Sequence, residues 1–135
     1  MAALTTARNT PERAGNDLSL PVAANAKIYQ GALVAVNATG FAVPGSTATT
    51  LKAVGRANAQ ADNTGGADGA VSAKVSRGVF KFSNSGADPI GQANVGGTAY
   101  IVDDQTVAAT NGAGTRSAAG KIIDIESDGV WVEIR

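Results

Sequence analysis

The side chains that could do chemistry in this 135-residue chain are carboxylates, hydroxyls and a few aromatic rings, because it contains neither histidine nor cysteine. Histidine is the usual general base and the commonest metal ligand, and cysteine supplies thiolates for catalysis, disulfides and zinc sites. Serine and threonine are plentiful. Without histidine their ready activating base would be a buried lysine, and no Ser-x-x-Lys signature occurs. The residue types therefore predict that the protein is not an enzyme.

Two pairs of carboxylates are candidates for a metal or acid–base site. Asp62 and Asp68 lie in a glycine-rich segment, and oxygen ligands on a flexible loop can hold calcium. Their spacing matches neither the EF-hand loop nor a glycine-rich nonapeptide repeat, so turn formation is favoured. Asp103 and Asp104 are adjacent, which on a strand sends side chains to opposite faces, whereas paired catalytic carboxylates must converge. The sequence thus predicts no metal and no cofactor.

The charge balance bears on nucleic acid and membrane partners. The segment Arg77–Phe82 has the basic, glycine and aromatic residues with which some strands stack RNA bases. However, 11 basic and 11 acidic residues leave no net positive charge to attract phosphates or anionic lipid. No apolar stretch reaches the ~20 residues of a membrane span, and residues 1–20 lack a signal-peptide pattern. We expect a soluble protein made in the cytoplasm, with no nucleic-acid or membrane partner.

Three aromatic residues could instead contact a partner. Trp131 alternates with valines on the last strand and shares its face with Glu133 and Arg135. It is either a core residue or an interface anchor, and the charged neighbours favour the interface. Sugar sites usually combine an exposed aromatic ring with polar groups, so Tyr29, Tyr100 and Trp131 are also candidate stacking platforms for carbohydrate.

The composition predicts many short strands around a thin core. The chain has 17 glycines and 4 prolines, only 4% aromatic residues, and 27 alanines within its 44% hydrophobic share. Its length suits one domain, with one core as the working assumption. The predicted fold class is therefore all-β, a small β-barrel or β-sandwich of short antiparallel strands with an extended N-terminal arm.

Period-2 patterns and turn residues place the strands. A hairpin is expected over 27–44 with its turn at 37–40, and a loop over 62–69. Along 71–82 the buried face changes near Gly78, as at a β-bulge. A last hairpin is expected to turn at Ser127, Asp128 and Gly129, where glycine can supply a positive φ. The remaining strands are expected at 51–57, 97–102, 106–109, 121–126 and 130–134.

Residues 1–20 are polar and show no sustained period, which predicts an arm before a domain at 21–135. Within the arm, Thr10 could cap a single helical turn that has Pro11 at its first position and continues to Arg13. A frayed terminus is the alternative.

From about Lys27 to Arg135 the chain resembles the capsid cement or head-decoration proteins of tailed phages, also called capsid fibre proteins. The order and spacing of several segments carry the resemblance: Gly31–Val36 with Gly40–Val43, Val54–Ala57, Arg77–Phe80, Gly97–Asp104, and Ala119–Ile123 with Val130–Ile134. The chain differs from the family in its longer arm and in its loop at 62–69.

This resemblance implies a structural virion protein, located on the outer surface of a bacteriophage capsid. Its partner would be the major capsid protein, whose subunit contacts it would cement, and it would form a homo-oligomer, with a trimer favoured and a dimer possible. It implies no chemistry. The arm residues expected to contact the capsid are Leu4, Arg8, Pro11 and Arg13, with Trp131 as a second candidate. The alternative function is a carbohydrate-binding surface module of a phage particle.

Overall fold

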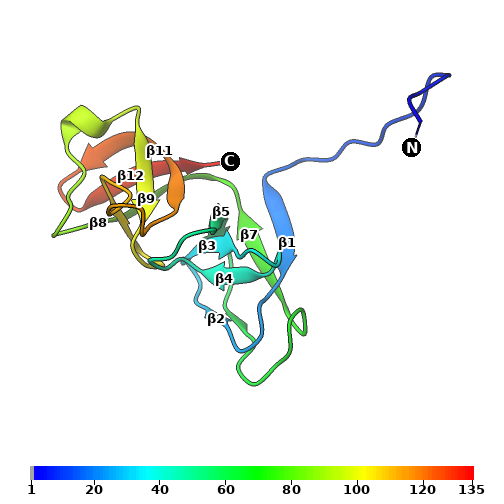
Figure 1. Ribbon diagram of the computed structural model, residues 1–135, viewed down its shortest axis with the longest axis horizontal. Helices are drawn as coiled ribbons and strands as arrows, with labels where there is room; N and C mark the ends of the chain where they lie inside the picture. The colour runs from blue at the N-terminus through cyan, green and yellow to red at the C-terminus, as the bar shows by residue number, and fades with distance from the viewer. Residues whose placement is uncertain (1) are drawn as a thin grey trace.

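The computed structural model describes residues 2–135 and consists mainly of β-strands and the loops between them, which confirms the predicted all-β class (Figure 1). No helix in this part of the chain is long and apolar enough to cross a membrane. The elements are β1 (Asp17–Pro21), β2 (Lys27–Ile28), β3 (Leu33–Val36), β4 (Ala42–Pro44), β5 (Lys52–Ala57), β6 (Ala61–Asp62), β7 (Ser72–Ser76), β8 (Gly78–Asn84), the 3-10 turn η1 (Gln92–Asn94), β9 (Thr98–Ile101), β10 (Thr106–Ala108), β11 (Ala118–Glu126) and β12 (Gly129–Ile134).

A curled sheet forms one half of the domain. Its strand order is β1-β7-β5-β3-β4, and each neighbouring pair is antiparallel. An isolated parallel bridge between Val22 and Ala42 joins the end of β1 to β4, so the sheet bends towards closure. Strands β2 and β6 pair beside it. The curled sheet and this strand pair enclose an apolar cluster rich in alanine: Val22, Ile28, Ala32, Val34, Ala42, Ala57, Ala61, Ala73 and Val75.

A closed barrel forms the other half, in the order β10-β8-β12-β11-β9 (Figure 1). Strands β10 and β8 pair in parallel, and the other neighbours are antiparallel. The predicted hairpin of β11 with β12 is present, and the strands expected at 97–102 and 106–109 form a second hairpin, β9 with β10. Closure leaves the barrel without an open sheet edge. A second apolar cluster combines residues of the barrel with residues of β3: Leu33, Ala35, Phe82, Ile90, Ala99, Ile101, Val107, Ala119, Ile122, Val130, Val132 and Ile134.

Strand β3 has residues in both clusters. Leu33 and Ala35 pack in the barrel cluster, whereas Val34 packs in the cluster of the curled sheet, and all three are fully buried. Successive residues of a strand face opposite sides, so one strand can serve two cores. The expectation of a single core is therefore corrected to two clusters. They share β3 because the chain folds into two strand assemblies that pack on each other.

The predicted change of buried face along 71–82 is confirmed. Ala73 and Val75 are buried in the curled sheet, whereas Phe82 is buried in the barrel and Val79 is exposed. The cause is a change of sheet between β7 and β8 at Arg77 rather than the predicted bulge. Gly78 has a φ of 154°, a conformation that side chains rarely adopt, which explains glycine at the crossing.

The turn of the last hairpin uses its glycine differently from the prediction. Ser127 and Asp128 form the turn, and Gly129 opens β12 without a positive φ. A Cβ atom at Gly129 would lie only 2.7 Å from the Phe82 carbonyl oxygen on β8. Glycine is therefore required by the close approach of two strands, not by turn conformation.

The N-terminal arm is shorter than predicted. Strand β1 begins at Asp17 and pairs with β7 over its whole length, so the last four residues assigned to the arm belong to the domain. Met1 lies outside the described residues. The helical turn over Thr10–Arg13 is wrong: these residues have no secondary structure, because an isolated turn lacks the packing that offsets helix nucleation. We call residues 2–14 the free arm.

We predict that Leu33→Ala lowers the free energy of unfolding by about 2–5 kcal/mol, because it opens a cavity where the two clusters meet. Leu4→Ala, the same substitution on the free arm, should change it by less than about 0.5 kcal/mol, since Leu4 is 71% exposed. Urea unfolding followed by Trp131 fluorescence measures both. Equal midpoints for the two variants would contradict the role assigned to β3.

Candidate partner-binding surface

The free arm is the most accessible segment of the protein. Every one of its residues is exposed, and it extends away from the domain (Figure 1). No hydrogen bond or ion pair within the described chain ties it to the domain. The predicted contact residues Leu4, Arg8, Pro11 and Arg13 are therefore all available to a partner.

The root of the arm, which we define as residues 15–17, is in contrast fixed to the curled sheet. The Arg77 amide donates a 2.7 Å hydrogen bond to the Asn16 carbonyl oxygen, and the Ser76 hydroxyl donates one of 2.8 Å to Asp17 Oδ1. Next along the chain, β1 pairs with β7 from Asp17 to Pro21. Since β7 leads directly into the barrel through Arg77, any pull on the arm acts at the junction of the two halves.

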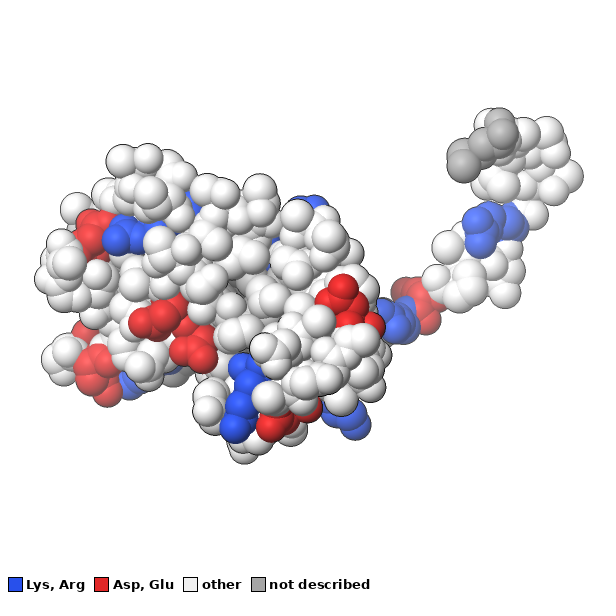
Figure 2. Space-filling model, turned by 60° about the horizontal axis from the view of Figure 1, so that its bottom comes forward, with Lys and Arg blue, Asp and Glu red and all other residues white. Residues whose placement is uncertain are grey.

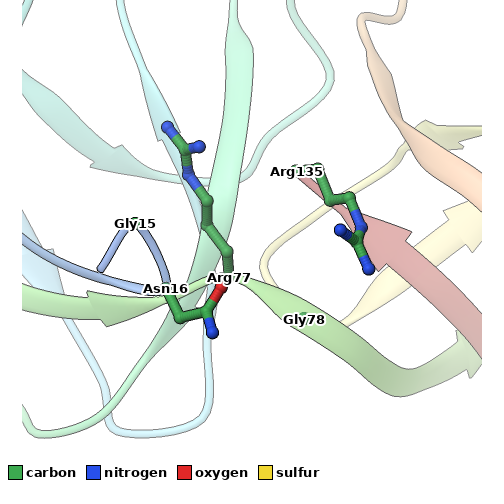
Figure 3. A pocket seen from close by; sticks show the side chains of 5 residues that line it. All are labelled: Gly15, Asn16, Arg77, Gly78 and Arg135. Carbon is green, nitrogen blue, oxygen red and sulfur yellow. The ribbon is translucent and has the colours of Figure 1, made fainter. Parts of the chain in front are cut away.

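Two hollows lie on either side of this root. One, of about 290 Å³, is lined by Gly15, Asn16, Arg77, Gly78 and Arg135. The Arg77 and Arg135 side chains lie apart and do not converge on one point (Figure 3), so this hollow lacks the geometry of an anion site. The other, of about 460 Å³, is lined along the edge of β1 by Arg13, Asp17, Leu18, Ser19, Asn58 and Lys74.

More positive than negative side chains lie around the root, although the whole chain has no net charge. Arg13, Lys74 and Arg77 form no ion pair within residues 2–135, and Arg135 is paired with Glu133 at 3.0 Å. The visible charges elsewhere are scattered among uncharged side chains (Figure 2). Sequence reasoning did not place Lys74 or Arg77 beside the arm, because nothing in the spacing shows that β1 pairs with β7.

Trp131 lies on the outer face of the barrel, between the buried Val130 and Val132 of β12. Its indole nitrogen donates a 2.9 Å hydrogen bond to Glu126, and the Lys81 ammonium group lies 5.8 Å from the ring centroid. Lys81 also pairs with Glu126 at 3.4 Å and with Asp128 at 2.9 Å. The structure therefore does not bring Trp131 together with the arm residues, and the tryptophan is half-buried in a network of charges.

The remaining candidate residues divide between turns and surface. Asp62 accepts hydrogen bonds from the amide and hydroxyl of Thr64, and Asp68 accepts one from the Ala24 amide. Asp103 accepts one from the Gln105 amide. The bonds of Asp62 and Asp103 are local turn contacts, whereas the Asp68 bond joins its loop to a segment 44 residues away in sequence. Among residues 2–135, no three acidic side chains are grouped in a way that could hold a metal ion.

No family model, curated protein or solved structure matches the chain. The function of the free arm and of the side chains around it therefore has to be inferred from their geometry.

The ion pairs beside Trp131 predict a measurable titration. The Lys81 hydrogen bond and charge lower the pKa of Asp128 below 3.8, so the charged pair persists at neutral pH and is lost only as the pH falls through this lowered value. In Lys81→Met the Asp128 pKa should move up towards 3.8, followed by NMR of the carboxyl carbon.

Asp62 is the internal control, because its pKa is lowered mainly by hydrogen bonds from Thr64. Its titration should be unchanged in Lys81→Met. An Asp128 titration that is the same with and without Lys81 would show that the pair does not form in solution.

Proposed function

We propose that this protein is a structural virion protein that binds the outer surface of a bacteriophage capsid and cements contacts between major capsid protein subunits. The observation that carries the proposal is the free arm, an exposed segment whose root is hydrogen-bonded into a β-domain. The sequence resemblance to capsid cement proteins agrees with this design.

The free arm supplies contacts that the domain cannot make by itself. An exposed segment that orders on a partner loses conformational entropy, and its contacts have to offset that loss. When the domain and the arm bind neighbouring subunits, the second contact is intramolecular and is strengthened by the high effective concentration. The resulting linkage stabilises the shell as well as the bound protein.

Charge complementarity would orient the protein on its partner. Arg8 and Arg13 on the arm, with Lys74 and Arg77 beside its root, favour an acidic surface on the major capsid protein. Such exposed charges are screened by salt, with a Debye length of about 8 Å at physiological ionic strength. Binding should therefore weaken as salt is raised. In keeping with the resemblance, we also propose that the protein forms a symmetric homo-oligomer, with a trimer favoured over a dimer.

Deleting residues 2–14 should leave the domain folded and weaken its binding to expanded empty capsids. The deletion must stop before Asn16, because that carbonyl group accepts the hydrogen bond from Arg77. Thermal unfolding checks the fold, and co-sedimentation with capsids measures the binding. If the truncated protein co-sediments as tightly as the full chain, the arm has no such role.

A charge-reversal pair separates the electrostatic part of arm binding. Arg8→Glu with Arg13→Glu should weaken co-sedimentation about tenfold or more at low salt, whereas Arg8→Lys with Arg13→Lys keeps the charge and should bind nearly as the parent does.

Mass spectrometry of purified virions should find the chain at a fixed ratio to the major capsid protein. Its absence, or its presence in a few copies only, would overturn the proposed function.

A further inference from the structure

A shallow hollow of about 180 Å³ lies between two turns of the chain that are distant in sequence. It is lined by Tyr29, Gln30, Gly31, Ala32, Asp104 and Gln105. We propose that this hollow binds one neutral hexopyranose unit of a polysaccharide. This activity goes beyond capsid binding, and it can be measured on the isolated protein.

Both turns are fixed by backbone geometry. The first turn is closed by a 3.1 Å hydrogen bond from the Ala32 amide to the Tyr29 carbonyl oxygen, and Gly31 has a φ of 88°. In the second, the Gln105 amide donates to Asp103 Oδ1 at 2.9 Å. A 2.8 Å bond from the Leu33 amide to the Asp104 carbonyl oxygen joins the two turns. Leu33 is fully buried, so this bond connects the hollow directly to the core.

Tyr29 is one of the residues that line this hollow, and it is largely exposed. Its side chain is 55% exposed, although its neighbour Ile28 is fully buried in the curled-sheet cluster. The Lys27 ammonium group lies 5.1 Å from the ring centroid and 4.0 Å from the Asp62 carboxylate. The Lys27 ammonium group therefore lies over one face of the ring, and a sugar would pack on the other face. A sugar ring presents a face of C–H groups, which packs well on such an aromatic plane.

The polar side chains around Tyr29 have the donors and acceptors that hydroxyl groups need. Gln30, Asp104 and Gln105 make no side-chain hydrogen bond or ion pair within residues 2–135. A carboxylate accepts hydrogen bonds from hydroxyls, and an amide both donates and accepts. The carboxylate of Asp104 disfavours acidic sugars. The volume is below the roughly 300–1,000 Å³ of drug-sized sites, which suits a single sugar ring.

Trp131 and Tyr100 do not offer an equivalent site. The indole nitrogen of Trp131 is bonded to Glu126, and its ring lies in a network of charges. Tyr100 is half-buried on β9, between β10 and β11. Of the three aromatic side chains that the sequence nominated, Tyr29 is the one that combines exposure with unpartnered polar neighbours.

The test is an NMR titration of the ¹⁵N-labelled full chain with the methyl glycosides of glucose, galactose, mannose and N-acetylglucosamine at millimolar concentrations. At least one glycoside should shift the amide signals of Gly31, Ala32 and Gln105 in a saturable way. Tyr29→Ala should weaken that affinity about tenfold or more, and Tyr29→Phe should retain it, because the ring is kept. Asp104→Asn should weaken it through the lost carboxylate.

The matched control is Tyr100→Ala, which removes the same side chain outside the hollow and should leave the affinity unchanged if the variant is folded by its amide spectrum. The proposal is overturned if none of the four glycosides shifts these amides, or if the shifts persist unchanged in Tyr29→Ala. Either result leaves the capsid proposal intact, because co-sedimentation tests the free arm and not the hollow.

Discussion

The double burial of strand β3 is the constraint on which the rest of the structure depends. Leu33 and Ala35 fill the barrel cluster while Val34 fills the other cluster, so neither half of the domain has a complete core without this strand. The curled-sheet cluster is rich in alanine, and burial of such short side chains contributes little per residue. Stability therefore depends on the two halves staying packed together.

Close backbone contacts hold this arrangement as much as side-chain packing does. Gly55 on β5 has a φ of 150°, and a Cβ atom there would collide with the Ser76 carbonyl oxygen on β7. A Cβ atom at Gly120 on β11 would likewise collide with the Glu133 carbonyl oxygen on β12. The glycines that the composition associated with turns thus also allow strands to approach each other inside the sheets.

The same architecture relates the two proposed surfaces to the core. The arm root bonds to Arg77, where β7 passes into β8 and the curled sheet gives way to the barrel. The Tyr29 hollow is joined to the barrel side through the bond between Leu33 and Asp104. An arm held by a partner and a sugar held by Tyr29 would both act on the packing between the halves. Occupancy of either site should therefore stabilise the domain.

The sequence by itself determined the all-β class, the terminal hairpin and the reversal of buried face near Gly78, because alternation and turn residues are local signals read within a few residues. The 27 alanines also agree with the alanine-rich cluster of the curled sheet, but not with the larger side chains of the barrel cluster. The two-cluster arrangement, the pairing of Asp17–Pro21 with β7 and the meeting of Tyr29 with Asp104 were decided only by tertiary structure. Each joins segments tens of residues apart, and a polar, alternating stretch such as Asp17–Pro21 becomes a strand only when a partner strand lies beside it.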